Sequence, residues 1–285
     1  MSEYSGELES KYFIEKNLEC FTKKNIYDKN GNLLLSKDKK ITDEIKIKLK
    51  ERGNYYQEKS NGFDKKKNTV LAPIIQTFGE RKNIRNLRRM EQPHKILNNI
   101  IFESKAKPWW IYVNALSNYV DWIYTHSIDV AMISLMMAVE LGYNDKDQWN
   151  IGLGAFLHDV GKLLVPKAII QKPGPLSDIE TVCIRQHCEL GTSSLKAFDL
   201  PKECTDIILQ HHERLDGSGY PKGLKEDEIS LNARIVMIAD VLDGISSPRP
   251  YKQALKMEAA INILRLDEKK FSQELVLLLE KVLEI

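Results

Sequence analysis

The sequence predicts a mainly α-helical protein, in which a large all-helical domain follows a small α+β module. Apolar residues recur at helical spacing through most of residues 108–285, which predicts a bundle of helices with short loops. Residues 1–69 are polar and lysine-rich, with short apolar runs separated by turn residues. The composition, 42% hydrophobic and 29% charged, is that of a globular chain long enough for one large or two smaller domains.

The amino-terminal module is predicted from one hairpin and one helix. Asn30-Gly31 separates two apolar runs, so residues 27–35 are expected to form a strand, a turn and a strand. Thr42 is a suitable N-cap for a helix from Asp43 to Glu51, although the alternating Ile-Lys-Ile-Lys-Leu pattern there also suits a strand. We expect a packing, regulatory or interaction module, because the sequence gives it no cluster of convergent polar side chains.

Residues 70–107 are predicted to be a partly helical linker. A basic stretch within them is expected to be a solvated helix face, with an anion-binding or partner-docking face as the alternative. The residues of this stretch are Arg81, Lys82, Arg85, Arg88 and Arg89.

The helical domain, residues 108–285, is predicted element by element. One long helix contains His126 and the apolar residues after it and ends near Gly142, and a second reaches Val160. Ser177 and Glu180 form a capping-box pattern, so a helix is expected from Ser177 to residue 190, with Gly191 as its stop. Further helices are expected at Pro201–His212, Leu231–Ile245, Met257–Leu264 and Leu266–Ile285.

Charge and composition disfavour several classes of partner and location. The formal net charge of +2 gives no electrostatic case for nucleic acid or a membrane surface as the main partner. The first residues lack the regions of a secretory signal, and no apolar run reaches the roughly 18 residues of a membrane-spanning helix. We therefore expect a cytoplasmic protein. Its cysteines lack Cys-x-x-Cys spacing and are expected to be reduced thiols, with metal ligation as the less favoured alternative. They are Cys20, Cys183, Cys188 and Cys204.

Histidines and aspartates of the helical domain predict a metal site. His211 and His212 are adjacent at the end of an apolar helix, and neutral imidazole is the commonest metal ligand. An aspartate within an apolar helix needs a partner, because burying an unpaired carboxylate is costly. A common site would satisfy His126, His158, Asp159, His187, His211, His212 and Asp240 at once. So many ligands suit a pair of divalent transition metals better than one ion, which takes four to six ligands.

Three cations follow these residues along the chain. Lys162 lies one turn past His158 and Asp159, where it could hold a phosphate oxygen, although an exposed lysine at a helix end is the ordinary alternative. Arg249 and Lys252 follow Asp240 and are placed to bind a phosphodiester anion. Two metal ions about 3.5–4 Å apart are a common device for phosphodiester cleavage.

These residues lie within a series of motifs. The motifs are His126, His158-Asp159-Val160-Gly161-Lys162, Lys172-Pro173-Gly174-Pro175-Leu176, His187, His211-His212-Glu213, Asp216-Gly217-Ser218-Gly219-Tyr220-Pro221, Ala239-Asp240 and Arg249-Pro250-Tyr251. In this order they resemble the HD-GYP family, the bacterial cyclic di-GMP phosphodiesterases of the HD phosphohydrolase superfamily. The resemblance covers residues 110–265 approximately.

The resemblance implies an HD-type phosphohydrolase fold and a role for each matching residue. One ion would be held by His126, His158, Asp159 and Asp240, and Asp159 would bridge to a second ion held by His187, His211 and His212. A hydroxide bridging the ions would attack phosphorus, and Lys162 would contact the scissile phosphate. Arg249, Lys252 and Asp243 would contact the substrate, and Gly219, Tyr220 and Pro221 would shape the rim of the site and a partner surface. Iron is expected, with manganese as the alternative, and the product would be pGpG, GMP or both.

One departure from the family bears on the number of ions, and the residues leave the substrate open. Members with a third metal carry a glutamate where this chain has Trp122, which favours two ions. Cyclic di-GMP and 3′,3′-cGAMP both remain candidate substrates. A sensor that binds a cyclic dinucleotide without turnover is another hypothesis, and so is a mononucleotidase, which the Gly-Ser-Gly-Tyr-Pro loop disfavours. A homodimer and a protein partner of the amino-terminal module are further expectations.

Overall fold

The structure, a computed structural model, describes the backbone of strands between residues 13 and 57, residues 78, 79 and 82, and residues 88–247 and 254–284. The chain divides into two units, residues 1–72 and 73–285.

The first unit contains two small antiparallel sheets. β1 (Phe13–Lys16), β2 (Glu19–Thr22) and β5 (Lys40–Ile41) form one sheet, in the order β1-β2-β5. β3 (Ile26–Asp28), β4 (Leu33–Leu35) and β6 (Tyr55–Gln57) form the other, in the order β4-β3-β6. Tyr27 pairs with Leu33 across β3 and β4, within the segment expected to form a hairpin. Their connecting turn and the predicted helix Asp43–Glu51 lie outside the described residues.

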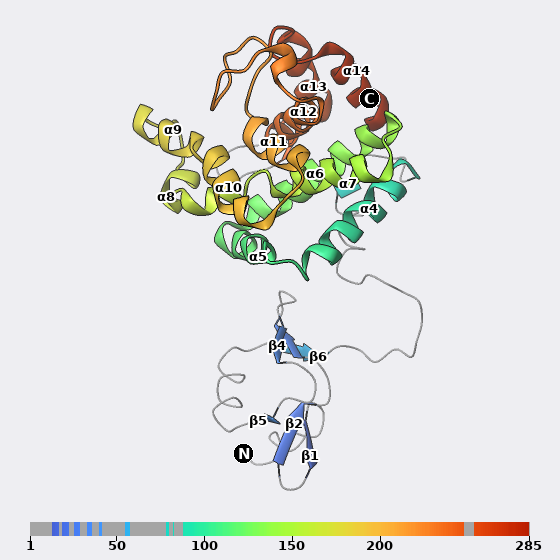
Figure 1. The fold of residues 1–285 in the computed structure, drawn as a ribbon, viewed down its shortest axis with the longest axis vertical. Coiled ribbons are helices and arrows are strands. Elements are labelled where there is room, and N and C mark those ends of the chain that lie inside the picture. Colours follow the sequence, from blue (N-terminus) through green and yellow to red (C-terminus); the bar gives the residue numbers. More distant parts are fainter. Residues whose placement is uncertain are drawn as a thin grey trace. The chain divides into compact units, whose positions relative to one another are not determined.

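The second unit is mainly helical in its described part (Figure 1). Its first half contains α4 (Arg88–Ser104), α5 (Trp110–Tyr119), α6 (Asp121–Glu140), α7 (Asp145–Leu157), the 3₁₀ helix η1 (Val160–Leu164) and α8 (Lys167–Ile170). Its second half contains α9 (Asp178–Arg185), α10 (His187–Leu195), η2 (Lys196–Phe198), α11 (Lys202–Gln210), η3 (Glu226–Glu228), α12 (Leu231–Ser246), α13 (Met257–Leu266) and α14 (Gln273–Leu283). The mainly α-helical class predicted from the sequence is confirmed.

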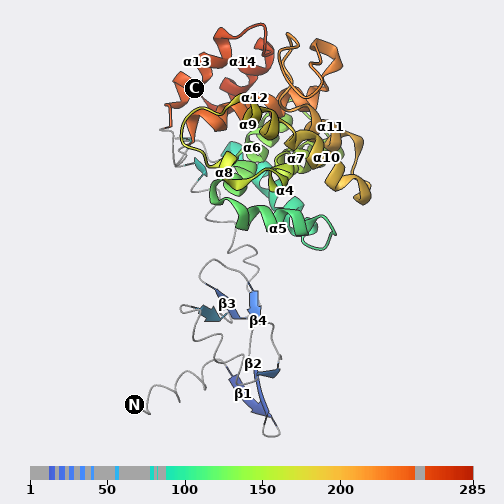
Figure 2. The same cartoon turned by 90° about the vertical axis from the view of Figure 1, so that its left-hand side faces the viewer.

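The core of this unit is built around α6. Figures 1 and 2 show α6 and α7 in the middle, with α4 and α5 on one side and α12 to α14 on the other. Val130, Ile133 and Leu135 on α6 are 0% exposed. Residues 122–140 are long and apolar enough to span a membrane by length and composition, but most of this helix is buried inside the protein. Its position in the core accounts for this apolar character.

Two predicted helix boundaries are wrong. The helix that begins after Ser177 has the predicted capping box with Glu180, but it ends at Arg185, and α10 starts separately at His187. Gly191 lies inside α10 and does not stop it. The predicted helix from Leu266 begins only at Gln273, after the N-cap Ser272, because Leu266 still belongs to α13.

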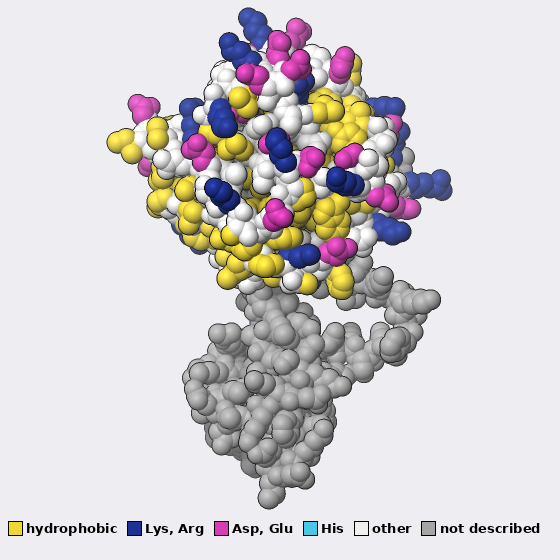
Figure 3. Space-filling view, in the orientation of Figure 1, with side chains coloured by type: hydrophobic (Ala, Val, Ile, Leu, Met, Phe, Trp, Pro, Cys, Tyr) yellow, Lys and Arg dark blue, Asp and Glu magenta, His cyan; other side chains and the backbone are white. Residues whose placement is uncertain are grey.

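The segment predicted as a linker contains α4, which packs on α6 and α7. Met90 and Ile100 of α4 are fully buried. One prediction for the basic stretch is wrong: the Lys82 side chain is 0% exposed, because its ammonium group forms an ion pair with Asp243. Arg89 is partly exposed and bonds to Glu140 and Glu284. On the face shown in Figure 3, cationic and anionic side chains are interspersed.

Candidate metal centre

The seven predicted ligand residues converge from five helices. His126 lies on α6, His158 caps the end of α7, and Asp159 follows it. His187 is the first residue of α10, and His211 caps the end of α11. His212 follows His211, and Asp240 lies on α12. Six of the seven are buried, and the His212 side chain is 17% exposed. The site therefore forms where helix ends meet inside the bundle.

Asp159 stands between two groups of imidazoles. Its Oδ2 lies 3.7 Å from His126 Nε2 and 3.3 Å from His158 Nε2. Its Oδ1 lies 3.5 Å from His187 Nε2 and 4.0 Å from His211 Nε2. One carboxylate thus presents a separate oxygen atom to each histidine group.

The carboxylate of Asp240 also lies against histidines of the cluster. Its Oδ1 lies 3.0 Å from His126 Nε2 and 4.0 Å from His158 Nε2. Its Oδ2 lies 3.7 Å from His212 Nδ1. Asp240 therefore also faces both parts of the site.

Backbone carbonyl groups orient three of the imidazole rings. His158 Nδ1 donates to the carbonyl of Ala155 and His187 Nδ1 to that of Ile184, each at 2.6 Å, and His211 Nδ1 donates to that of Ile208 at 3.0 Å. A carbonyl oxygen only accepts, so the proton lies on Nδ1 in each neutral ring and Nε2 keeps its lone pair. Metal-binding histidines are held in this way.

Unpartnered buried atoms show that the cluster fits metal ions. His158 Nε2 and Asp159 Oδ1 are buried and, among the described residues, have no hydrogen-bond partner. Buried polar atoms normally have partners, and an unmade bond costs about 1–3 kcal/mol. Both atoms carry lone pairs and point into one cluster, so a cation would satisfy both.

The electrostatic state of the cluster also suits metal binding. Burial and the nearby charge of Lys162 lower the pKa of His187 to about 4, so this imidazole is unprotonated at neutral pH. Burial likewise holds the pKa of His211 well below its usual value. Burial would raise the pKa of Asp159, but His158 and Lys162 together hold it well below its usual value. The neutral imidazoles of His187 and His211 therefore lie beside the charged carboxylate of Asp159.

A close approach of backbones places His187 beside Asp159. A Cβ atom on Gly161 of η1 would lie 1.9 Å from the His187 carbonyl oxygen and 2.5 Å from the Gly191 nitrogen. Only a glycine at position 161 lets η1 lie this close to α10. Gly191 is therefore part of a helix contact, which explains why it does not stop α10.

Asp243 supports His126 from the side away from the cluster. Its Oδ2 accepts a hydrogen bond from His126 Nδ1 at 2.5 Å, and its Oδ1 lies 2.5 Å from Lys82 Nζ. Lys82 Nζ also donates to Ser246 Oγ at 2.9 Å. Burial lowers the pKa of His126, but bonds to Asp240 and Asp243 outweigh it and raise the pKa to about 9.

Asp243 is expected from the resemblance to contact substrate, but in this geometry its carboxylate faces His126 and Lys82. Its residue exposure is 1%, and both of its carboxylate oxygens are already engaged. It orients a ligand residue instead, as carboxylates behind metal-binding histidines do.

Lys162 and Trp122 flank the cluster. Lys162 is 8% exposed, and its Nζ donates to Asp159 Oδ2 at 2.6 Å. The ring of Trp122 lies 6.3 Å from that of His126, and Lys162 Nζ lies 6.0 Å from the Trp122 ring. An indole thus covers the side of the site next to His126.

The predicted rim residues lie beside His212. The Tyr220 ring stacks on the His212 ring at 4.7 Å, and its backbone N–H donates to the His212 carbonyl at 3.1 Å. A Cβ atom on Gly219 would lie 2.4 Å from Glu213 Cα, so a glycine is required there. Pro221 follows Tyr220 and is half-buried. Arg249 and Lys252 lie outside the described residues.

Two residues near the cluster were not identified from the sequence as part of it. Lys82 belongs to a stretch whose charges resemble a surface, and lysine is rarely buried unless it is paired. Cys188 follows His187, and its Sγ lies 3.6 Å from His187 Nε2. The position of Cys188 directly after His187 could have indicated from the sequence that it lies near the cluster. No feature of the sequence indicated this for Lys82.

Comparison with known proteins gives a family, two similar enzymes and a similar fold. A family model described as an HD domain matches residues 111–275. A cyclic di-GMP phosphodiesterase of Pseudomonas aeruginosa is 39% identical over 142 residues, which are 50% of this chain and 34% of that protein. A 3′3′-cGAMP-specific phosphodiesterase of Vibrio cholerae is 37% identical over 178 residues, which are 60% of this chain and 41% of that protein. The chain thus spans less than half the length of these two curated relatives.

A solved structure has a similar fold. A Bdellovibrio bacteriovorus protein described as an HDGYP protein superposes with a TM-score of 0.54 and 19% identity, covering 96% of this chain and 97% of that one. The resemblance predicted from the sequence is confirmed. Since the family model covers more than half of the residues, this chain belongs to the HD domain family.

Proposed function

We propose that the chain is a metal-dependent phosphodiesterase that hydrolyses cyclic di-GMP to pGpG, GMP or both. The observation that carries this proposal is the position of Asp159, whose two oxygens face two separate groups of imidazoles. Such a carboxylate suits a two-metal site, and two-metal sites are common in phosphodiester hydrolysis. The similar enzyme from Pseudomonas aeruginosa, named for cyclic di-GMP, supports the substrate class.

Each proposed set of ligands contains the histidines that lie near one of the two carboxylate oxygens of Asp159. His126, His158 and Asp240 would hold one ion, and His187, His211 and His212 the other, with Asp159 shared. Two divalent transition metals, iron first and manganese as the alternative, would polarise the phosphodiester and lower the pKa of the attacking water. Asp243 fixes the ring of His126, and backbone carbonyls fix the rings of His158, His187 and His211.

Substrate contacts are proposed for residues around this cluster. The Lys162 ammonium group, held at Asp159, is placed to donate a hydrogen bond to a phosphate oxygen. Arg249 and Lys252 are proposed to bind the second phosphate and a guanine. Gly219, Tyr220 and Pro221 are proposed to form the rim, because Tyr220 stacks on His212.

A second candidate substrate is 3′,3′-cGAMP. The similarity to the Vibrio cholerae phosphodiesterase specific for that nucleotide favours it. It differs from cyclic di-GMP in one base, so the same phosphodiester chemistry would serve both. We further propose a cytoplasmic location and a regulatory or partner-binding role for the α+β module of residues 1–69. Self-association as a homodimer is also part of this proposal.

Incubation with a panel of nucleotides tests this function. Protein purified without oxygen and supplied with iron or manganese is incubated with cyclic di-GMP, 3′,3′-cGAMP, pGpG and GMP, and the products are separated by chromatography. We expect linear product from cyclic di-GMP. Tight binding without hydrolysis would instead indicate a sensor, and hydrolysis of the mononucleotide alone would indicate a nucleotidase.

A further inference from the structure

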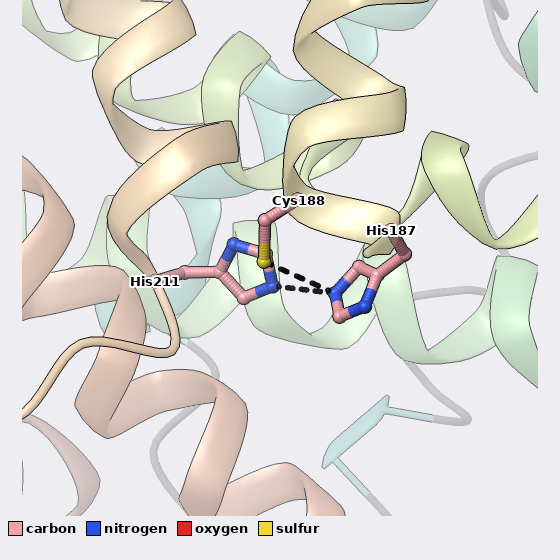
Figure 4. Close-up of side chains that lie close together, drawn as sticks. All are labelled: His187, Cys188 and His211. Carbon is pink, nitrogen blue, oxygen red and sulfur yellow. Dashed lines mark hydrogen bonds between the residues drawn. The ribbon is translucent and has the colours of Figure 1, made fainter. Parts of the chain in front are cut away.

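The side chain of Cys188 lies beside the predicted metal ligands, on the side toward the protein interior. It lies in the first turn of α10, directly after His187, and is 0% exposed. Figure 4 shows its sulfur next to the imidazoles of His187, on the same helix, and His211, at the end of α11. The ligand atoms of these three residues all lie within 4.8 Å of one another. Cys188 thus lies on the buried side of the histidines, whereas the His212 side chain is 17% exposed.

The two imidazoles beside Cys188 face each other with their lone pairs. His187 Nε2 lies 3.2 Å from His211 Nε2. Each ring donates its Nδ1 hydrogen to a backbone carbonyl, so in the neutral form neither Nε2 carries a hydrogen that could bond to the other. Two buried lone pairs at this distance repel each other unless a cation lies between them.

Two of the separations between these ligand atoms match those around a single ion. Nitrogen, oxygen and sulfur atoms held tetrahedrally at about 2.0–2.3 Å from an ion lie roughly 3.3–3.7 Å from one another. Cys188 Sγ lies 3.6 Å from His187 Nε2, and Asp159 Oδ1 lies 3.5 Å from the same nitrogen. The distance from Asp159 Oδ1 to His211 Nε2 is 4.0 Å, which is longer than this range.

A second buried cysteine shows what a purely structural thiol does in this protein. Cys204 on α11 is also 0% exposed, but its Sγ donates to the Asn150 carbonyl at 3.1 Å. The thiol of Cys188 has no such carbonyl acceptor among the hydrogen bonds of the described residues, where its contact is His187 Nε2. Cys204 therefore provides a matched control.

We propose that the Cys188 thiolate is a ligand of the ion held by His187 and His211. This inference rests on the proposed metal centre and adds a donor to it. On binding, the S–H bond breaks, the proton passes to solvent and a sulfur–metal bond forms. A soft sulfur ligand makes this half of the centre favour iron, cobalt or zinc over manganese or magnesium.

Cobalt substitution tests the proposal by a readout other than activity. The full chain, purified without oxygen, is loaded with cobalt(II), and its absorption spectrum is recorded. We expect a near-ultraviolet sulfur-to-cobalt charge-transfer band in the unmodified protein and in Cys204→Ser. The band should be absent in Cys188→Ser, while the visible bands of bound cobalt persist. This variant should bind cobalt at least about 10-fold more weakly and manganese with little change.

A second measurement uses only the unmodified protein, so it does not require that the Cys188→Ser variant folds. X-ray absorption at the cobalt edge should show a sulfur neighbour at about 2.3 Å. Bound cobalt with only nitrogen and oxygen neighbours would overturn the role of Cys188 and leave the proposed function standing. A charge-transfer band that survives in Cys188→Ser would overturn it too. Failure to bind cobalt at all would overturn both the cysteine ligand and the metal centre.

Discussion

Individual residues in the centre divide into those that could be recognised from the sequence and those that could not. The histidines and Asp159 stand in short motifs, and the structure brings them together. Asp243 lies three positions after Asp240, one turn along α12, so its sequence position does not reveal that it faces Lys82 and not the substrate. Long-range ion pairs of this kind follow only from the packing of the whole unit.

Lys82 provides a test at the residue scale. Replacing it in Lys82→Met leaves the buried carboxylate of Asp243 without its lysine partner, and breaking such a pair costs about 3–5 kcal/mol. His126 also loses a firmly held partner, so metal affinity should fall by about 10–100-fold. Thermal unfolding of the metal-free protein and metal titration measure the two effects separately.

Arg89 is the matched control for Lys82. It belongs to the same basic stretch, but its ion pairs with Glu140 and Glu284 are partly exposed. Arg89→Met should therefore change stability by no more than about 1 kcal/mol and leave metal affinity unchanged. Lys82→Arg should restore part of the affinity. Equal metal affinity in Lys82→Met and unmodified protein would remove Lys82 from the support of the site.

At the scale of elements, the sequence predicted the helices better than their ends. The capping box at Ser177 and Glu180 was predicted correctly, because its pattern is local. The break between α9 and α10 was not predicted, since no glycine or proline marks it and Gly191 has another use. Gly191 contacts Gly161, and this contact between distant segments cannot be predicted from the sequence of either segment alone.

The contact between η1 and α10 can be tested through Gly161. Gly161→Ala would place a methyl carbon 1.9 Å from the His187 carbonyl oxygen, where only backbone movement can relieve the overlap. His187 should then move away from Asp159, and the protein should lose about one metal equivalent and most of its turnover. Metal analysis and steady-state kinetics measure both losses.

Gly142 is the control for a general loss of stability. Its φ of 73° strains any other residue, so Gly142→Ala should cost about 1–2 kcal/mol. No atom lies within 4 Å of the added Cβ, so metal content should stay normal. If Gly161→Ala kept its full metal content, the close approach of η1 and α10 would not be what positions His187.

At the scale of the whole molecule, the bundle assembles one site from five helices that are separate in the sequence. α6 supplies His126, α12 supplies Asp240, and the ends of α7, α10 and α11 supply or adjoin the other predicted ligands. The mainly helical class and the identity of the converging residues could be predicted from periodicity and motifs. The sequence could not predict which oxygen of Asp159 faces which histidines, because this depends on how η1 lies against its neighbours.

The most direct test of the central claim is metal reconstitution of the stripped protein, with bound metal and cyclic di-GMP turnover measured in the same samples. We expect about two equivalents per chain at saturation, with turnover appearing as the second is filled. His211→Ala should bind about one equivalent fewer and lose nearly all turnover, because a ligand is missing. A stripped protein that binds no metal, or that hydrolyses cyclic di-GMP equally well without it, would contradict the account.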